Sequence, residues 1–130
     1  MTETRTTTLG ERLLFETKRW PWSWEGVPED IPLGRDLVKV MLLFLQALVA
    51  SGAAPTTLRR HFWNAWVLGG HIVRHVSLDR PAQHAPALEL VLEAVGEDGG
   101  PLITDFVAED QQRSFDSTCR QLSRFLRKRR

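Results

Sequence analysis

VMLLFLQALVASG, residues 40–52, is the stretch that decides the fold. From position 37 to position 48, apolar residues recur every three or four positions, which is the spacing of one face of an α-helix. Asp36 lies in the first turn, where a negative charge favours the helix dipole, and Gly52 can end the helix in the left-handed conformation. The pattern predicts a helix over residues 34–51.

The next segment, AAPTTLRRHFWNAW at residues 53–66, predicts a turn followed by a second helix. The hydroxyl of Thr56 or Thr57 is placed to cap its first turn. The helix runs from residue 58 to about residue 68, or onward to residue 74. Gly69 and Gly70 together cost a helix interior about 2 kcal/mol relative to alanine. Either the helix breaks at this pair, or another helix packs against it.

The rest of the chain completes an all-α pattern. Helical spacing predicts short helices over residues 9–19, 85–95 and 102–107, with a connection at 79–81. Ser114 is placed to cap a last helix, and its apolar stripe is Phe115, Cys119, Leu122, Phe125 and Leu126. No segment alternates like a β-strand. We predict one compact domain of five or six short helices, with residues 36–130 forming the bundle.

Residues 1–35 are expected to form an N-terminal helix and an arm rich in tryptophan and proline. The arm begins with WPWSW at residues 20–24, and Pro21 biases Trp20 away from the helical region, so an extended segment is predicted. Three large rings in five residues are costly to expose. Trp20, Trp22 and Trp24 either strap the arm over a groove of its own bundle or dock onto a second subunit or another protein.

The charge is unevenly distributed. The net charge is +1, yet residues 113–130 carry seven Lys/Arg against one Asp, and the rest of the chain carries ten against fifteen Asp/Glu. The single cysteine, Cys119, suits a reducing cytoplasm. The longest apolar stretch, residues 38–50, is too short to span a bilayer. We therefore expect a cytoplasmic protein with no membrane partner and a basic contact surface near the C-terminus.

Three segments together resemble the N-terminal core-binding, SAM-like domain of tyrosine recombinases. They are residues 40–52, residues 53–66 and RSFDSTCRQLSRFLR at residues 113–127. The turn holds Gly52, Pro55, Thr56, Thr57 and Leu58 at the family's turn positions. The resemblance implies contact with duplex DNA through the helix after the turn and through the last helix. The implied DNA-binding residues are Thr57, Arg59, Arg60, Asn64, Arg120, Arg124, Arg127 and Lys128.

Elementary chemistry gives these cations two interpretations. Arg120, Arg124 and Arg127 are spaced by four and three positions, so they share a helix face and could each fork onto phosphate oxygens in a salt-dependent, largely sequence-blind way. The DNA hypothesis requires the arginines of both helices to converge on one wall of the bundle. The other interpretation is an ordinary solvated face, whose last cations stabilise the helix dipole.

Candidate catalytic groups are incomplete. His71 and Arg74 spell the HxxR of the recombinase catalytic domain, but the chain has no tyrosine to act as nucleophile. His71 and His75 share a helix face without a third metal ligand. Cys119 lies on an apolar stripe, where a thiol is an inert small apolar group. The acids between residues 97 and 110 lack a calcium-loop spacing. We expect them to balance the charge of the basic tail, either within the fold or in a dimer.

We therefore predict a non-catalytic protein with no metal and no cofactor. The leading hypothesis is a DNA-binding helical module of low sequence specificity. The alternative is a protein-interaction or dimerisation adaptor, antitoxin- or inhibitor-like, that uses the tryptophan arm.

Overall fold

The structure is a computed structural model that describes residues 7–78 and 85–129. Its elements are α1 (Leu9–Glu16), η1 (Thr17–Arg19), α2 (Trp20–Ser23), α3 (Asp30–Ala50), α4 (Pro55–Leu78), α5 (Ala87–Ala94) and α6 (Glu109–Lys128). No β-strand forms in these two ranges, where the only pairing of extended backbone is an isolated bridge between Gly96 and Gly99. The all-α prediction is confirmed. The connection predicted at residues 79–81 and the terminal Arg130 lie outside the described residues.

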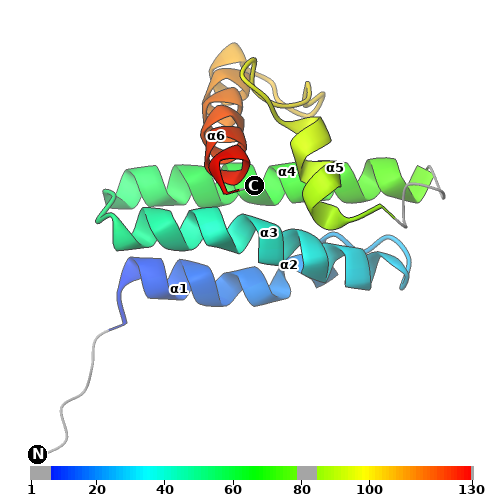
Figure 1. The fold of residues 1–130 in the computed structure, drawn as a ribbon, viewed down its shortest axis with the longest axis horizontal. Coiled ribbons are helices and arrows are strands. Elements are labelled where there is room, and N and C mark those ends of the chain that lie inside the picture. Colours follow the sequence, from blue (N-terminus) through cyan, green and yellow to red (C-terminus); the bar gives the residue numbers. More distant parts are fainter. Residues whose placement is uncertain (1–6, 79–84, 130) are drawn as a thin grey trace, which may run out of the picture.

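The helices pack in two directions. In Figure 1, α1, α3 and α4 run close to parallel, and each of the three contacts the other two. α6 crosses α3 and α4 steeply, and α5 lies beside it against α3. The buried stripe of α3 is the one predicted, with Leu37, Met41 and Leu45 fully buried. The core therefore forms where α3 and α4 meet α6.

α3 begins at Asp30, four residues before the predicted start. The Asp30 carboxylate accepts hydrogen bonds from the backbone N–H of Gly26 (2.9 Å) and Val27 (3.1 Å) and from the hydroxyl of Ser77 (2.6 Å). Burial alone would raise the pKa of Asp30, but these hydrogen bonds outweigh it and hold the pKa below its ordinary value. At the other end, Gly52 adopts a φ of 77°, the left-handed conformation that the sequence predicted.

Residues 20–24 are not an extended arm, as the sequence predicted, but helical. The 3₁₀ turn η1 leads directly into α2, and Pro21 sits in the first turn of α2, where a missing N–H leaves no hydrogen bond unmade. Pro21 packs against α3, because a Cβ at Gly34 would come within 3.0 Å of it. We call residues 17–24 the strap, since they cover their own bundle.

α4 continues through Gly69 and Gly70 without a break, and it begins at Pro55, ahead of the predicted cap at Thr56 or Thr57. The indole of Trp24, from the strap, packs on Gly69 and Gly70, where the sequence predicted either a break or another helix. A Cβ at Gly69 would lie 2.2 Å from Trp24 Cζ2, and one at Gly70 would lie 3.1 Å from Trp24 Cδ1. The two glycines therefore make room for a tryptophan.

The segment between α5 and α6 also differs from the prediction. Residues 102–107 form no helix; they are a turn whose Ile103 is buried. The side chain of Gln112 accepts from Ile103 N–H (2.9 Å) and donates to Pro101 O (3.0 Å), so side-chain bonds replace helical ones. α6 begins at Glu109 instead of at Ser114, and its N-terminus is preceded by a turn in which Gln111 Oε1 accepts from Val107 N–H (2.9 Å).

Candidate interaction surface

Trp63 and Trp66 form a ridge of two adjacent indoles on the outer face of α4, which we call the tryptophan ridge. Trp63 is 58% exposed, although its neighbours Phe62 and Asn64 are buried at 3%. Its ring lies 5.0 Å from that of the half-buried Trp66, measured between centroids. The Trp66 indole N–H donates to Ser23 Oγ of the strap at 2.8 Å, so Trp66 is held in place while Trp63 faces solvent. The exposed indole of Trp63 thus stands beside a second, fixed indole on the outer face of α4.

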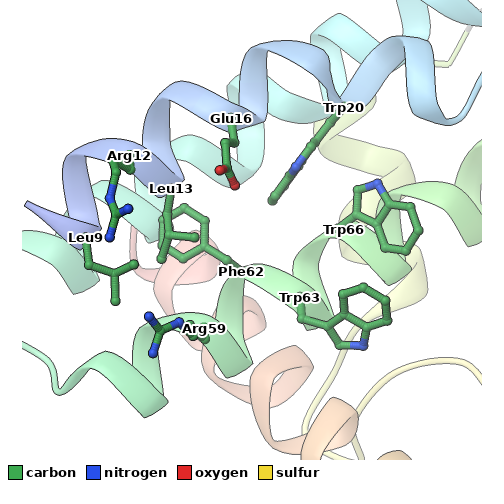
Figure 2. Close-up of a pocket in the computed structure, with 9 residues that line it drawn as sticks. All are labelled: Leu9, Arg12, Leu13, Glu16, Trp20, Arg59, Phe62, Trp63 and Trp66. Atoms are coloured by element: carbon green, nitrogen blue, oxygen red, sulfur yellow. The ribbon is translucent and has the colours of Figure 1, made fainter.

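On one side of the ridge is a groove between α1 and α4, with a volume of about 490 Å³. Figure 2 shows its lining. The apolar residues that line it are Leu9, Leu13, Trp20, Phe62, Trp63 and Trp66. The groove is thus an apolar trough walled by two near-parallel helices and closed at one end by the strap.

Three charged side chains line the same groove. Arg12 and Glu16 come from α1, and Arg59 comes from α4. In Figure 2 the two guanidinium groups lie toward the Leu9 end, and the Glu16 carboxylate lies farther along, toward Trp20. Within residues 7–78 and 85–129, none of these three side chains has an ion pair or a side-chain hydrogen bond.

A second hollow of about 490 Å³ lies on the other side of the ridge. It is lined by Trp24, Trp63 and Trp66 and, from the turn before α6, by Ile103 and Phe106. Arg74 and Asp105 form an ion pair at its edge, with a distance of 3.7 Å between nitrogen and oxygen. Trp63 borders both hollows, so the two form one surface divided by the ridge.

Two of the three predicted DNA-binding arginines of α6, Arg124 and Arg127, make polar contacts within the chain. Arg124 Nη2 lies 3.1 Å from Glu97 Oε2, and this hydrogen bond lowers the pKa of the Glu97 carboxyl. Arg127 donates from Nη2 to the backbone oxygens of Leu92 (2.9 Å) and Val95 (3.1 Å), where α5 ends. Arg113 pairs with Asp110. Several acids between residues 97 and 110 thus balance basic residues within one chain, as one of the two predicted arrangements required.

The remaining members of the predicted set are distributed elsewhere. Arg59 lines the groove against α1, whereas Arg60 borders Asp110 and Ser114 at the start of α6. Arg124 and Arg127 lie at the opposite end of α6, which at 20 residues is about 30 Å long. Arg120 and Thr57 are half-buried, and Lys128 is exposed. The structure therefore does not gather the arginines of α4 with those of α6 on one wall.

Asn64 belongs to the predicted DNA-binding set, but it is buried in a polar network. Its Nδ2 donates to Thr118 Oγ1 at 2.9 Å, and His61 Nδ1 lies 2.8 Å from the same oxygen. Burial, with a smaller contribution from Arg60, lowers the pKa of His61 below its ordinary value. A polar residue was assigned to the surface because its partner, 54 positions away, is not visible in a local pattern.

The predicted partner-binding tryptophans of the strap have three different environments. Trp24 is 8% exposed and donates from Nε1 to the backbone oxygen of Trp66 at 3.0 Å. Trp20 is half-buried and lines the groove. Trp22 is 53% exposed, with the Arg35 guanidinium 5.1 Å from its ring centroid. Trp24 packs on its own bundle, as the strap interpretation expects, and is not available to a partner, whereas Trp22 stays exposed.

The groups considered for catalysis or metal binding are arranged as follows. The rings of His71 and His75 lie 4.2 Å apart, and burial, then the neighbouring His75 and Arg74, lowers the pKa of His71. In the described ranges, no three His, Cys, Asp or Glu side chains come together as a metal site. Cys119 is 1% exposed, and burial raises the pKa of its thiol, so it stays protonated and unreactive.

Trp63 and Arg12 are the surface residues that sequence reasoning missed. A signal for Trp63 was present, because adjacent helical residues point about 100° apart, so Phe62 and Trp63 face different directions on the predicted helix. Arg12 carried no such signal, because its importance depends on α1 lying beside α4. The pairing of those two helices is a tertiary contact.

No family model, curated protein or solved structure matches the chain. The resemblance to the recombinase core-binding domain therefore stays a prediction. Over the residues that the structure describes, none of the helices has both the length and the apolar character needed to cross a bilayer.

Proposed function

We propose that this chain is a non-catalytic protein-interaction module that binds a helical segment of another protein in the groove between α1 and α4. The observation that carries the proposal is the 58% exposed Trp63, which stands on a rigid helix between two apolar hollows. Large aromatic residues beside apolar pockets are the usual energetic centres of protein interfaces. This is the adaptor function of the sequence analysis, moved from the strap to the ridge.

The shape of the groove favours a helix as the occupant. Two near-parallel helices form its walls, and a third helix can lay its apolar face into such a trough. Both walls pack on α3, so the groove is formed without a partner. A preformed site of this kind loses little conformational entropy when the partner binds.

Duplex DNA is the competing partner, and the geometry favours it less. Arg124 already pairs with Glu97, and Arg127 already caps α5 through two carbonyl oxygens. Phosphates would have to displace these contacts before binding. Arg59 and Arg60, the two predicted DNA-binding arginines of α4, have no such contacts among the described residues, but they face different parts of the surface.

The test is selection of binding peptides from a displayed random library about 15 residues long, enough for roughly four helical turns. Selected peptides are then titrated by fluorescence anisotropy against the wild type, Trp63→Ser and Trp22→Ser. Trp22 is the matched control, because it is a tryptophan of similar exposure that does not line the groove. A random DNA duplex is titrated in parallel at low and high salt.

The proposal expects peptides with apolar residues at helical spacing, whose affinity falls about 10-fold or more with Trp63→Ser and stays unchanged with Trp22→Ser. It fails if no selected peptide depends on Trp63. Strong, steeply salt-dependent duplex binding that Trp63→Ser leaves intact would replace it with the DNA function.

A further inference from the structure

The charged residues that line the groove indicate the charge pattern of a helix that would fit it. Arg12 on α1 and Arg59 on α4 bring two positive charges to the same end of one apolar trough. Neither guanidinium is paired with an acid among the residues that the structure describes. This differs from Arg74, Arg113 and Arg124, each of which has an acidic partner within the chain.

A partner helix lying in the trough would remove water from both guanidinium groups. Desolvating an unpaired charge is costly, whereas a carboxylate placed between the two arginines would receive charge-assisted hydrogen bonds from both walls. An apolar helix without an acid at this position would leave two like charges unpaired at its edge. The groove therefore selects for an acidic residue at the Leu9 end.

Glu16 gives the groove a second charge, of opposite sign, which would fix the orientation of a bound helix. It lies one helical turn after Arg12 on α1 and points into the groove nearer to Trp20. An acid in the partner at this second position would be repelled, and a lysine or arginine there would be attracted. The order of charges along the groove is thus positive at the Leu9 end and negative toward the strap.

We infer that the partner is an amphipathic helix that carries an acidic residue opposite Arg12 and Arg59 and a basic residue about one turn away, opposite Glu16. The inference rests on the proposed function and deepens it, because it states the chemistry and the orientation of the occupant. Apolar residues at three- and four-residue spacing face Leu13, Trp63 and Trp66. The charge order then decides which way round the helix lies.

The experiment uses the peptides selected against the full chain. Their affinities are measured for the wild type, for Arg12→Glu/Arg59→Glu, and for Arg35→Glu/Lys39→Glu. The last pair makes the same change in net charge at exposed positions of α3 that do not line the groove. Each peptide is also made with its acid replaced by lysine; this charge-exchanged peptide keeps its base opposite Glu16, which the variant leaves unchanged. Circular dichroism checks that every protein variant stays folded.

We expect acidic residues to be enriched at one end of the selected peptides. Arg12→Glu/Arg59→Glu should weaken their binding about 10-fold or more, and the charge-exchanged peptide should recover most of that loss. The α3 variant should bind like the wild type. A structural role for the two arginines could not produce recovery by an exchanged peptide.

Two results overturn the inference and are distinguishable. If selected peptides need Trp63 but show no enrichment of acids, or bind Arg12→Glu/Arg59→Glu as well as the wild type, the charge rule is wrong and the interaction module stands. If no Trp63-dependent peptide is selected, the proposed function fails and the charge rule fails with it.

Discussion

The indole of Trp24 occupies the space that a side chain at Gly69 would need. A Cβ at Gly69 would lie 2.2 Å from Trp24 Cζ2 and 2.3 Å from Cη2, far inside van der Waals contact. The same indole donates its N–H to the backbone oxygen of Trp66 at 3.0 Å. Gly69 is unfavourable for helix propensity, but its lack of a side chain lets the strap pack on α4. The Trp24 indole packed there also contacts Trp20 and bonds to Trp66, both at the end of the groove.

The first prediction is that Gly69→Ala destabilises the protein. Alanine in place of glycine inside a helix would by itself raise the free energy of unfolding by about 1 kcal/mol. Here the new methyl group must displace a buried indole, and overpacking of this kind costs about 1–3 kcal/mol. We expect a net decrease in the free energy of unfolding, measured by urea denaturation followed by circular dichroism.

The control is the same substitution in a Trp24→Leu background. Trp24→Leu alone lowers stability because it leaves a cavity, but it also removes the atoms that a Gly69 side chain would meet. Gly69→Ala should then be neutral or stabilising. The coupling energy from the double-mutant cycle should therefore be destabilising, opposite in sign to the stabilisation that alanine gives through helix propensity. A stabilising effect of Gly69→Ala in the wild type would show that Trp24 does not pack there.

The main helices could be predicted because their information is local. Residues 37–48 of α3 and the apolar stripe of α6 repeat at helical spacing, and burial of that face follows directly. The strap could not be predicted in this way. Pro21 is compatible with an extended segment and with the first turn of a helix, and the contact that decides between them joins Trp24 to a glycine 45 positions away.

The candidate surface was less predictable than the fold for the same reason. The basic residues of α6 form a real helical stripe, but whether they are free depends on Glu97 and on the end of α5. Asn64 has a polar side chain whose partner lies on α6. Patterns of residue type identify helix faces, and they do not identify which faces meet.

The second prediction concerns the buried network around Thr118, which is 2% exposed. Thr118→Val keeps the shape of the side chain and removes the oxygen that His61 and Asn64 share. Two buried polar groups would lose a partner, so the free energy of unfolding should fall by about 1–3 kcal/mol. Ser117→Ala is the control on the same helix, because Ser117 is only half-buried. Equal stability of Thr118→Val and the wild type would contradict the network.

The third prediction is a loss of stability on mild acidification. Burial lowers the folded-state pKa of His61 and of His71 below the ordinary value of about 6.5. The unfolded chain therefore binds more protons below that pH, so the free energy of unfolding is constant above it and decreases as the pH falls through it. Urea midpoints measured between about pH 5 and pH 8 test this.

The variant His71→Gln separates the two histidines. It removes one contribution and leaves His61, which is 1% exposed, so a shallower decrease should remain. Asp30 acts in a different range: its pKa is lowered in the folded state, so its contribution is lost only as the pH falls below about 4. A flat profile between pH 8 and pH 5 in the wild type would be incompatible with a depressed pKa for either histidine.

The fourth prediction separates the two arginines of α6 that the sequence treated alike. Arg127 donates to the carbonyl oxygens of Leu92 and Val95, which have no helical N–H to accept because α5 ends there. Arg127→Gln should lower the free energy of unfolding by about 1 kcal/mol. Arg124→Gln removes only an exposed pair with Glu97, and surface pairs of this kind contribute little, so its stability should match the wild type within error.

Arg127→Lys sharpens the comparison, because lysine keeps the charge but lacks the Nε that donates to Ser123 Oγ at 2.9 Å and orients Nη2 toward both carbonyl oxygens. We expect it to behave like Arg127→Gln rather than like the wild type, as measured by urea denaturation. Amide exchange should also accelerate in α5 for both Arg127 variants and not for Arg124→Gln, since only Arg127 holds the end of that helix. If Arg124→Gln proves more destabilising than Arg127→Gln, the ion pair with Glu97 stabilises the end of α5 more than the hydrogen bonds of Arg127 do, and the capping role assigned to Arg127 is wrong.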